Sequence, residues 1–184
     1  SQILTYMNEV LPPDAIVCNG ARNYAAWPNR FYRFRRPRTQ VAPTSGAMGF
    51  GFPAAIAAKL VHPDRDVIAL AGDGCFLMTG QELATAVQYG ANLVTLVIDN
   101  GSYGTIRMYQ ERSYPQRVIA TELRNPDFAA YARAFGAIGM TVERTEDFAP
   151  AFAQARAAQR PVVIHVKTSV EDILPGQRLH AQPK

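Results

Sequence analysis

Residues 66–104 read DVIALAGDGCFLMTGQELATAVQYGANLVTLVIDNGSYG, and this stretch decides the fold. A mostly apolar run at 66–71 stops at a Gly-Asp-Gly triplet, and a segment with helical spacing of apolar residues follows at 79–90. A second apolar run, rich in Val and Ile, occupies 93–99. Strand, helix and strand in this order join two parallel strands of one sheet, because a parallel pair needs a long crossover. The stretch therefore predicts an α/β fold.

The rest of the chain repeats this alternation of short apolar runs and longer helical segments. Nearly continuous apolar runs are typical of strands that helices cover on both faces. Further strands are predicted at 15–19, 137–142 and 161–166, with a short one at 39–43. Further helices are predicted near 2–10, 48–60, 126–135 and 147–158. The predicted fold is a three-layer α/β/α domain around a mostly parallel sheet of about six strands.

Two of the predicted helices adjoin polar loops. Residues 103–115 form a predicted helix directly after the Asn-Gly turn. In the helix near 126–135, Asn125 is expected to cap the first turn and Gly136 to end the last one.

Length and composition restrict the class of protein. The chain has 184 residues, of which 48% are hydrophobic and 18% charged, as in one globular domain. We expect that domain over 1–175 and a polar tail over 176–184. No apolar stretch is long enough to cross a bilayer, and the first residues lack the basic region of a signal peptide. The two cysteines have no metal-ligand spacing, so a reducing cytoplasm is the expected location.

An arginine-rich stretch, RFYRFRRPR at 30–38, carries five arginines among aromatic residues in a chain of net charge +4. Arginine with aromatic side chains suits phosphates and stacked bases, so a nucleic-acid-binding module is one hypothesis. A solvated loop or a subunit contact is the favoured interpretation, because one short patch is weak support for nucleic-acid binding. We expect neither nucleic acid nor a membrane as a partner.

Polar residues stand where two predicted strands end. Asp73 follows the run at 66–71, and Asn100 follows the run at 93–99, 27 positions after Asp73. Parallel α/β sheets bind ligands at the carboxyl ends of their strands. Carboxylate and amide oxygens suit Mg²⁺, which prefers few protein ligands together with phosphate oxygens. Because glycines flank Asp73, a diphosphate could approach the backbone closely. The pattern predicts a site for a metal ion and a diphosphate.

Each of these residues also has a simpler interpretation. Asp73 could cap the helix that follows it, and Asn100-Gly101 could be an ordinary turn. Their joint position, one strand–helix–strand unit apart, favours the metal–diphosphate site. A dinucleotide site would need Gly-x-Gly-x-x-Gly after a strand, and neither 72–90 nor 98–104 contains that pattern.

GDGCFLMTGQELATAVQYGANLVTLVIDNGSYG (72–104) resembles the thiamine diphosphate motif, in which Asn follows Gly-Asp-Gly one helix and one strand later. GAMGFGFPAAIAAKLVHPDRDVIAL (46–70) is similar to the acetolactate synthase branch of that superfamily. The resemblance extends over nearly the whole chain, from about LPPDAIVCNG to RPVVIHV. It implies the thiamine diphosphate-binding fold, as the C-terminal, diphosphate-binding domain of an enzyme that uses this cofactor with Mg²⁺.

The resemblance implies a role for each motif residue. Asp73 and Asn100 would bind the metal through their side chains, and Ser102 through its backbone carbonyl. The Gly46 carbonyl would accept a hydrogen bond from the cofactor's amino group. Met48 would support the folded cofactor, an ordinary core position being the alternative. The other implied cofactor contacts are Asn23, Tyr24, Gly72, Gly74, Cys75, Tyr103, Gly104 and Thr105.

Two features separate this chain from a complete active site of the family. Asp99 stands where the family has the first of two asparagines, and it adds a negative charge. No segment resembles the pyrimidine-binding domain, which carries the glutamate that activates the cofactor. The chain alone is therefore expected to be inactive. It would need that domain from the same or another polypeptide, in a homodimer or homotetramer.

The activity implied by the resemblance is decarboxylation of a 2-oxo acid, with ligation or release of the aldehyde unit. In the family, side chains just after the turn face the reacting carbon, so Ile106 and Tyr109 are the substrate-side candidates. One alternative is the diphosphate-binding subunit of a two-chain 2-oxo acid decarboxylase. Another is a non-catalytic assembly domain, against which the intact motifs argue.

Overall fold

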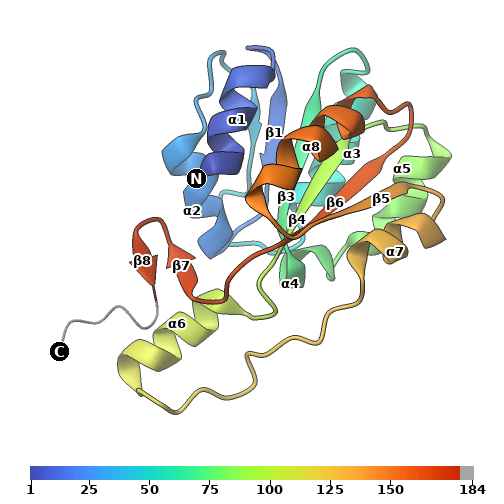
Figure 1. Ribbon diagram of the computed structural model, residues 1–184. Coiled ribbons are helices and arrows are strands. Elements are labelled where there is room, and N and C mark those ends of the chain that lie inside the picture. The colour runs from blue at the N-terminus through green and yellow to red at the C-terminus, as the bar shows by residue number, and fades with distance from the viewer. Residues whose placement is uncertain (179–184) are drawn as a thin grey trace.

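Six parallel strands form the central sheet of the computed structural model, which describes residues 1–178 (Figure 1). The strands are β1 (Ile16–Asn19), β2 (Gln40–Val41), β3 (Val67–Gly72), β4 (Val94–Asp99), β5 (Ile138–Val142) and β6 (Val162–Lys167). Their order across the sheet is β2-β1-β3-β4-β6-β5. Each lies where an apolar run predicted it, so the expected parallel α/β sheet is confirmed.

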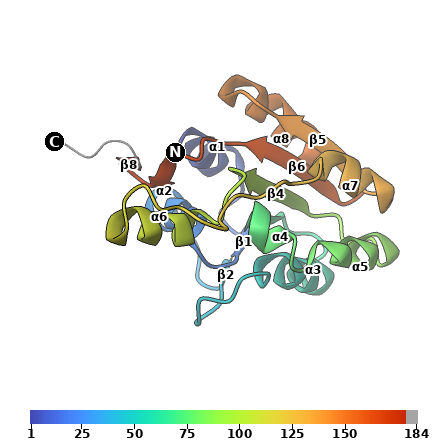
Figure 2. The ribbon, with the colours of Figure 1, turned by 90° about the horizontal axis from the view of Figure 1, so that it is seen from below.

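Helices cover both faces of the sheet and make the expected three layers (Figure 2). One face carries α3 (Gly51–Val61), α5 (Leu83–Gln88) and α7 (Phe128–Ala134). The other carries α1 (Gln2–Val10), α2 (Ala26–Phe31) and α8 (Phe148–Ala157). Two more helices, α4 (Asp73–Phe76) and α6 (Gly104–Ser113), begin just after β3 and β4. Short 3₁₀ turns are η1 (Asn23–Ala25), η2 (Gly80–Glu82) and η3 (Thr145–Asp147).

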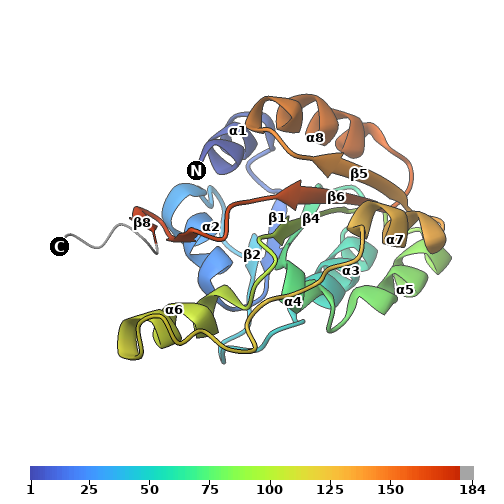
Figure 3. The same ribbon diagram turned by 60° about the horizontal axis from the view of Figure 1, so that its bottom comes forward.

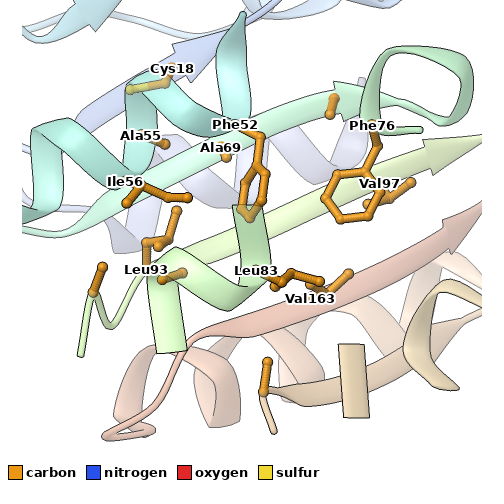
Figure 4. Packing of buried hydrophobic residues seen from close by; sticks show 14 of the residues in the cluster. Cys18, Phe52, Ala55, Ile56, Ala69, Phe76, Leu83, Leu93, Val97 and Val163 are labelled. Atoms are coloured by element: carbon orange, nitrogen blue, oxygen red, sulfur yellow. The ribbon is translucent and has the colours of Figure 1, made fainter. Parts of the chain in front are cut away.

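The core beneath α3 is aromatic, and it fixes the end of the short helix α4. The ring of Phe76 packs against Phe52 and Phe128, with centroids 5.2 and 5.6 Å away. Figure 4 shows Phe52 and Phe76 beside Leu83, with further strand residues around them. Burial of each such ring stabilises the fold by roughly 1.5–3 kcal/mol. Because Phe76 ends α4, the same packing holds Asp73 at the edge of the sheet.

The core on the other face joins α1 and α8 to the central strands. Phe148 and Phe152 of α8 stack with centroids 5.2 Å apart, and the edge of Tyr6 packs against both rings. Leu96 and Ile164 are fully buried beneath this layer. Strands β4 and β6 are therefore covered on both faces, as their continuous apolar sequences predicted.

The expectation that Asn125 caps the helix near 126–135 is wrong. Helix α7 begins at Phe128, and the Asp127 carboxylate caps it by accepting hydrogen bonds from the N–H groups of Ala129 and Ala130. The amide of Asn125 is engaged elsewhere, with two carboxylates at the sheet edge. The other end agrees with the prediction, because Gly136 follows α7 with a φ of +87°.

Several elements were not predicted. Helix α2 contains Pro28 in its first turn, and its six residues are too short to give a periodic pattern. An antiparallel hairpin pairs β7 (Asp172–Leu174) with β8 (Gln177–Arg178). The expected tail at 176–184 therefore begins inside this hairpin, and 179–184 lie outside the described residues.

The hairpin and α6 lie on the carboxyl side of the sheet (Figure 3). The Arg112 guanidinium donates to the side-chain oxygen of Gln177 at 3.0 Å and links the two. Over residues 1–178, no helix combines the length and the apolar character needed to cross a bilayer.

Candidate functional site

A cavity of about 410 Å³ opens at the carboxyl edge of the sheet, where β3 and β4 end. Its walls include residues of α1, η1, α2, α4, α6 and β7. The volume lies within the range of small-molecule and cofactor sites, roughly 300–1,000 Å³. The cavity therefore occupies the position at which parallel α/β sheets bind ligands.

Most of the site residues expected from the sequence line this cavity. They are Asn23, Tyr24, Met48, Gly72, Asp73, Gly74, Cys75, Asn100, Ser102, Tyr103, Gly104, Thr105 and Ile106. Two expected residues do not line it. Tyr109 lies one helical turn beyond Ile106 with 60% of its surface exposed, and Gly46 lies in open space.

Asp73 is the buried carboxylate of the cavity. Its Oδ1 accepts a hydrogen bond from the Gly74 N–H at 2.8 Å. Its Oδ2 accepts two, from the Gly101 N–H at 2.9 Å and from the Asn125 amide at 2.8 Å. Burial raises the pKa of Asp73 to about 6, outweighing the hydrogen bonds that favour the charged form. One acceptor position, on Oδ1, has no donor among these contacts.

The turn after β4 presents two more oxygens beside Asp73. The side-chain oxygen of Asn100 accepts the Ser102 N–H at 3.1 Å, and the Ser102 carbonyl accepts the Gly104 N–H at 2.8 Å. Gly101 enables this tight turn with a φ of +64°. Each oxygen keeps a second lone pair, because a carbonyl oxygen can accept two hydrogen bonds.

Asp99 is saturated with donors, which explains how the site accommodates its charge. Its Oδ2 is 2.7 Å from both His165 Nε2 and Lys167 Nζ. Its Oδ1 accepts from the Gly101 N–H at 2.9 Å and from the Asn125 amide at 2.7 Å. Burial alone would raise the pKa of Asp99, but the hydrogen bonds from His165, Lys167 and Asn125 hold it well below its ordinary value. All four acceptor positions are used, so Asp99 is a structural anion and has none left for a metal.

His165 faces Asp99 from the buried part of β6. Its Nδ1 accepts the Phe128 N–H at 3.3 Å, so a neutral ring carries its proton on Nε2 and donates it to Asp99. The side chain is only 2% exposed. The histidine therefore joins the start of α7 to the end of β4.

The opposite wall of the cavity holds a small polar network and a buried hydroxyl. The Thr105 hydroxyl donates to the side-chain oxygen of Asn23 at 2.8 Å and accepts the Asn23 N–H at 3.2 Å. The Tyr24 hydroxyl is buried close to the Cys75 thiol and to the backbone of Gly20 and Gly72, forms no well-aligned hydrogen bond among the described residues, and has its pKa raised by burial. A polar ligand group in the cavity could give this hydroxyl a better-aligned partner.

The glycines around Asp73 allow aromatic rings to lie directly on the backbone. A Cβ atom on Gly72 would lie 2.9 Å from Tyr24 Cδ1, and one on Gly74 would lie 2.6 Å from Tyr103 Cε1. Only glycine fits these two positions without moving a ring.

The donors of the site are hard oxygens. Within residues 1–178, no group of three or more His, Cys, Asp and Glu side chains is arranged to hold a metal. The cavity instead offers the Asp73 carboxylate, the Asn100 amide oxygen and the Ser102 carbonyl. Such a set suits a hard divalent cation that takes its remaining ligands from phosphate and water. The residues therefore fit a metal-bound diphosphate.

A family model described as "Thiamine pyrophosphate enzyme, C-terminal TPP binding domain" matches residues 20–166, which include the whole metal–diphosphate motif. The chain belongs to this family. Its fold and its cofactor, thiamine diphosphate, agree with the expectations drawn from Gly72-Asp73-Gly74 and Asn100.

Curated relatives place the chain in the acetolactate synthase-like branch. It is 38% identical over 169 residues to an acetolactate synthase of Mycobacterium leprae, covering 88% of this chain and 27% of the relative. It is 33% identical to the putative thiamine pyrophosphate-containing protein YdaP of Bacillus subtilis, covering 100% of this chain and 32% of the relative. It is 35% identical to a sulfoacetaldehyde acetyltransferase of Castellaniella defragrans, covering 86% of this chain and 27% of the relative. The chain thus spans less than a third of each of these relatives.

The sequence did not indicate several residues of the site. Trp27 and Lys167 line the cavity, while Asn125 and His165 lie behind it. His165 gave a signal, because it is a polar residue inside the apolar strand PVVIHV. The sequence around Asn125 predicted the wrong role for this residue, because its position before Pro126 is typical of a helix cap.

Proposed function

We propose that this domain binds thiamine diphosphate through a Mg²⁺ ion held by Asp73, Asn100 and Ser102. One observation carries the proposal: these three residues, which follow the ends of two adjacent strands, line a single cavity. One carboxylate, one amide and one carbonyl leave half of an octahedral shell for phosphate oxygens and water, as Mg²⁺ prefers.

The neighbouring residues would hold the rest of the diphosphate. The buried hydroxyl of Tyr24, which has no well-aligned partner among the described residues, and the amide of Asn23 would bind its far end, with Thr105 fixing the Asn23 side chain. The remaining residues would border the cofactor along the edge of the sheet. These are Gly72, Gly74, Cys75, Tyr103 and Gly104.

Thiamine diphosphate supplies the electron sink for decarboxylation when it is bound. The residues of this chain bind it, orient it and exclude water. Met48 and Ile106 give the cavity apolar wall beside its polar end, so they would support the ring system and face the substrate. The Gly46 carbonyl and Tyr109 lie outside the cavity and would act only if the partner domain brings the cofactor to them.

For the whole protein, we propose an acetolactate synthase-like activity: decarboxylation of a 2-oxo acid, with ligation or release of the aldehyde unit. The names of the relatives, acetolactate synthase and sulfoacetaldehyde acetyltransferase, support this class. The activating glutamate would come from a pyrimidine-binding domain of the same or a second chain, in a dimer or tetramer. The free thiols of Cys18 and Cys75 support a cytoplasmic location.

Calorimetric titration of the full-length protein with thiamine diphosphate tests the proposed site. Binding should be strong with Mg²⁺ present and weak after chelation, and Asp73→Ala should weaken the Mg²⁺-dependent part at least tenfold. Equal affinity with and without Mg²⁺ would exclude the metal-bridged site. Product analysis with pyruvate, glyoxylate and benzoylformate then separates ligation from simple decarboxylation.

A further inference from the structure

We propose that Asn125 is a positioning residue for the metal-binding carboxylate, and that it enforces binding through a single oxygen of Asp73. The inference deepens the proposed function, because it rests on Mg²⁺ binding at Asp73. It concerns a residue outside the cavity wall and in a different segment of the chain from the motif.

The amide of Asn125 bridges two carboxylates. Its Nδ2 lies 2.8 Å from Asp73 Oδ2 and 2.7 Å from Asp99 Oδ1, so each amide hydrogen has one carboxylate acceptor. Its Oδ1 is buried and has no hydrogen-bond partner within residues 1–178. Two negatively charged oxygens on one side fix the orientation of the amide, since a flipped amide would set oxygen against oxygen.

The bridge determines which oxygen of Asp73 can reach a metal. With the Gly101 N–H at 2.9 Å and the Asn125 amide, both acceptor positions of Oδ2 are filled. Oδ1 receives only the Gly74 N–H at 2.8 Å and retains one position. A carboxylate held in this way can bind a cation through Oδ1 alone, which suits the strict octahedral geometry of Mg²⁺.

Asn125 is itself held in place from two directions. Residues 121–123 run antiparallel to the metal turn: the Tyr103 N–H donates to the Thr121 carbonyl and the Leu123 N–H to the Gly101 carbonyl, each at 2.8 Å. Figure 3 shows the long segment between α6 and α7 passing along this edge of the sheet. The second anchor is Asp99, the partner of Asn125.

Asp99 is fastened to β6, because its carboxylate accepts from His165 and Lys167 at 2.7 Å. The chain of contacts therefore runs from the buried sheet through Asp99 and Asn125 to Asp73. Such supporting hydrogen bonds typically change metal affinity by 10–100-fold when they are removed. The negative charge of Asp99 has a use here: a carboxylate accepts all four donors, and an asparagine could not.

The test is the affinity of the full-length protein for Mg²⁺ and for Ca²⁺, each titrated with thiamine diphosphate held at saturation. Asn125→Leu keeps the approximate volume and removes both donors. We expect its Mg²⁺ affinity to fall roughly tenfold or more. Its Ca²⁺ affinity should fall less, because Ca²⁺ can bind both oxygens of one carboxylate and tolerates a variable coordination geometry. The ratio of the two affinities should therefore shift toward Ca²⁺.

Asp127→Ala is the matched control. It removes the cap of α7 two residues away and should lower the thermal unfolding temperature without changing the Mg²⁺/Ca²⁺ ratio. Asn125→Ser is the second variant should Asn125→Leu fail to fold, since a small hydroxyl cannot bridge both carboxylates. It should change the ratio in the same direction as Asn125→Leu.

The outcomes separate this inference from the proposed function. Wild-type Mg²⁺ affinity and an unchanged ratio in the folded Asn125 variants, with Asp73→Ala impaired, would overturn the positioning role alone. A wild-type protein that binds thiamine diphosphate without any need for Mg²⁺ would overturn both. A parallel loss of Mg²⁺ and Ca²⁺ affinity in the Asn125 and Asp127 variants would reduce Asn125 to a structural residue and would also overturn the inference.

Discussion

Asp73 and Asp99 are two carboxylates at neighbouring strand ends with opposite electrostatic surroundings. Asp73 receives three hydrogen bonds from neutral groups, and burial raises its pKa to about 6. Asp99 faces the Lys167 ammonium and three more donors, which hold its pKa below the ordinary value despite burial. Asp99 is therefore an anion paired with a cation of the chain, whereas Asp73 is a buried carboxylate that faces no cation of the chain among its hydrogen-bond partners.

The raised pKa of Asp73 predicts a pH-dependent stability in the metal-free protein. The carboxyl ionises near pH 3.9 in the unfolded chain and near 6 in the folded one, so stability falls as pH rises between these values. Above pH 6 the ionised Asp73 lowers the free energy of unfolding by its full amount, about 3 kcal/mol. Asp73→Asn should therefore gain stability relative to the wild type from pH 4 to pH 6 and keep that gain above.

Urea unfolding of both proteins at several pH values, with chelator present, measures this difference. If the free energies of unfolding of the two proteins differed by the same amount at every pH from 4 to 7, burial would not raise the pKa of Asp73.

Asp99→Asn tests the role of the second carboxylate. The change leaves Lys167 and His165 without a charged acceptor, so we expect a loss of about 2 kcal/mol in the free energy of unfolding. Lys167→Met is the control and should lose less than about 1 kcal/mol, because the lysine side chain is 46% exposed. Denaturant titrations at neutral pH measure both, and an Asp99→Asn protein as stable as the wild type would contradict the account.

The sequence indicated Asp73 and Asn100 because a polar residue at the end of an apolar run is a local pattern. It could not indicate Asn125, whose amide contacts Asp73 across 52 positions of the chain. The charge of Asp99 had no evident role from the sequence for the same reason, since its partners lie on β6, more than sixty positions away.

Helix α7 packs closely against β5, backbone to backbone. A Cβ atom on Gly139 of β5 would lie 2.0 Å from the Ala129 carbonyl oxygen of α7. No rotation of a side chain can relieve that contact, because the neighbour is backbone. The position of α7, and with it the segment that carries Asn125, depends on this glycine.

Gly139→Ala should therefore lower the free energy of unfolding by about 3 kcal/mol or more, since α7 must shift to admit one methyl group. Thr141→Ala, two residues along the same strand and exposed, should stay within about 0.5 kcal/mol of the wild type. Thermal unfolding of the two variants compares them directly. Similar melting temperatures for both would show that α7 is not held against β5 in this way.

Helices and strands could be predicted from the sequence where the pattern that indicates them lies within a few neighbouring residues. The five long strands were predicted within one residue at each end, because each lies in a short apolar run, and four of them are largely buried. The start of α7 was wrong, because Asn125 and Asp127 are both good caps and only tertiary contacts decide between them. The β7–β8 hairpin was missed because its strands are short, with three and two residues.

At the scale of the whole molecule, the chain provides one end of an active site. The proposed metal ligands Asp73, Asn100 and Ser102 line the same cavity as Tyr24, Met48 and Ile106. No segment of the sequence resembles a pyrimidine-binding domain, and the relatives are more than three times as long as the matched region. In the proposed function, this domain binds the diphosphate, and residues from elsewhere would activate the cofactor.

The 184-residue chain by itself is accordingly expected to release no carbon dioxide from pyruvate, even with thiamine diphosphate and Mg²⁺ at saturation. Coupled assays of carbon dioxide release, with and without the pyrimidine-binding domain, check this. Turnover by the chain alone, at a rate comparable with that of the complete protein, would contradict the proposal that another domain activates the cofactor.

The most direct test of the central claim is a crystal structure of the full-length protein with thiamine diphosphate and Mn²⁺, which replaces Mg²⁺ and gives anomalous scattering. The account predicts one anomalous peak about 2.2 Å from Asp73 Oδ1, Asn100 Oδ1 and the Ser102 carbonyl oxygen, with diphosphate oxygens completing the shell. Bound cofactor with the metal peak away from these three oxygens, or with no peak at all, would contradict it.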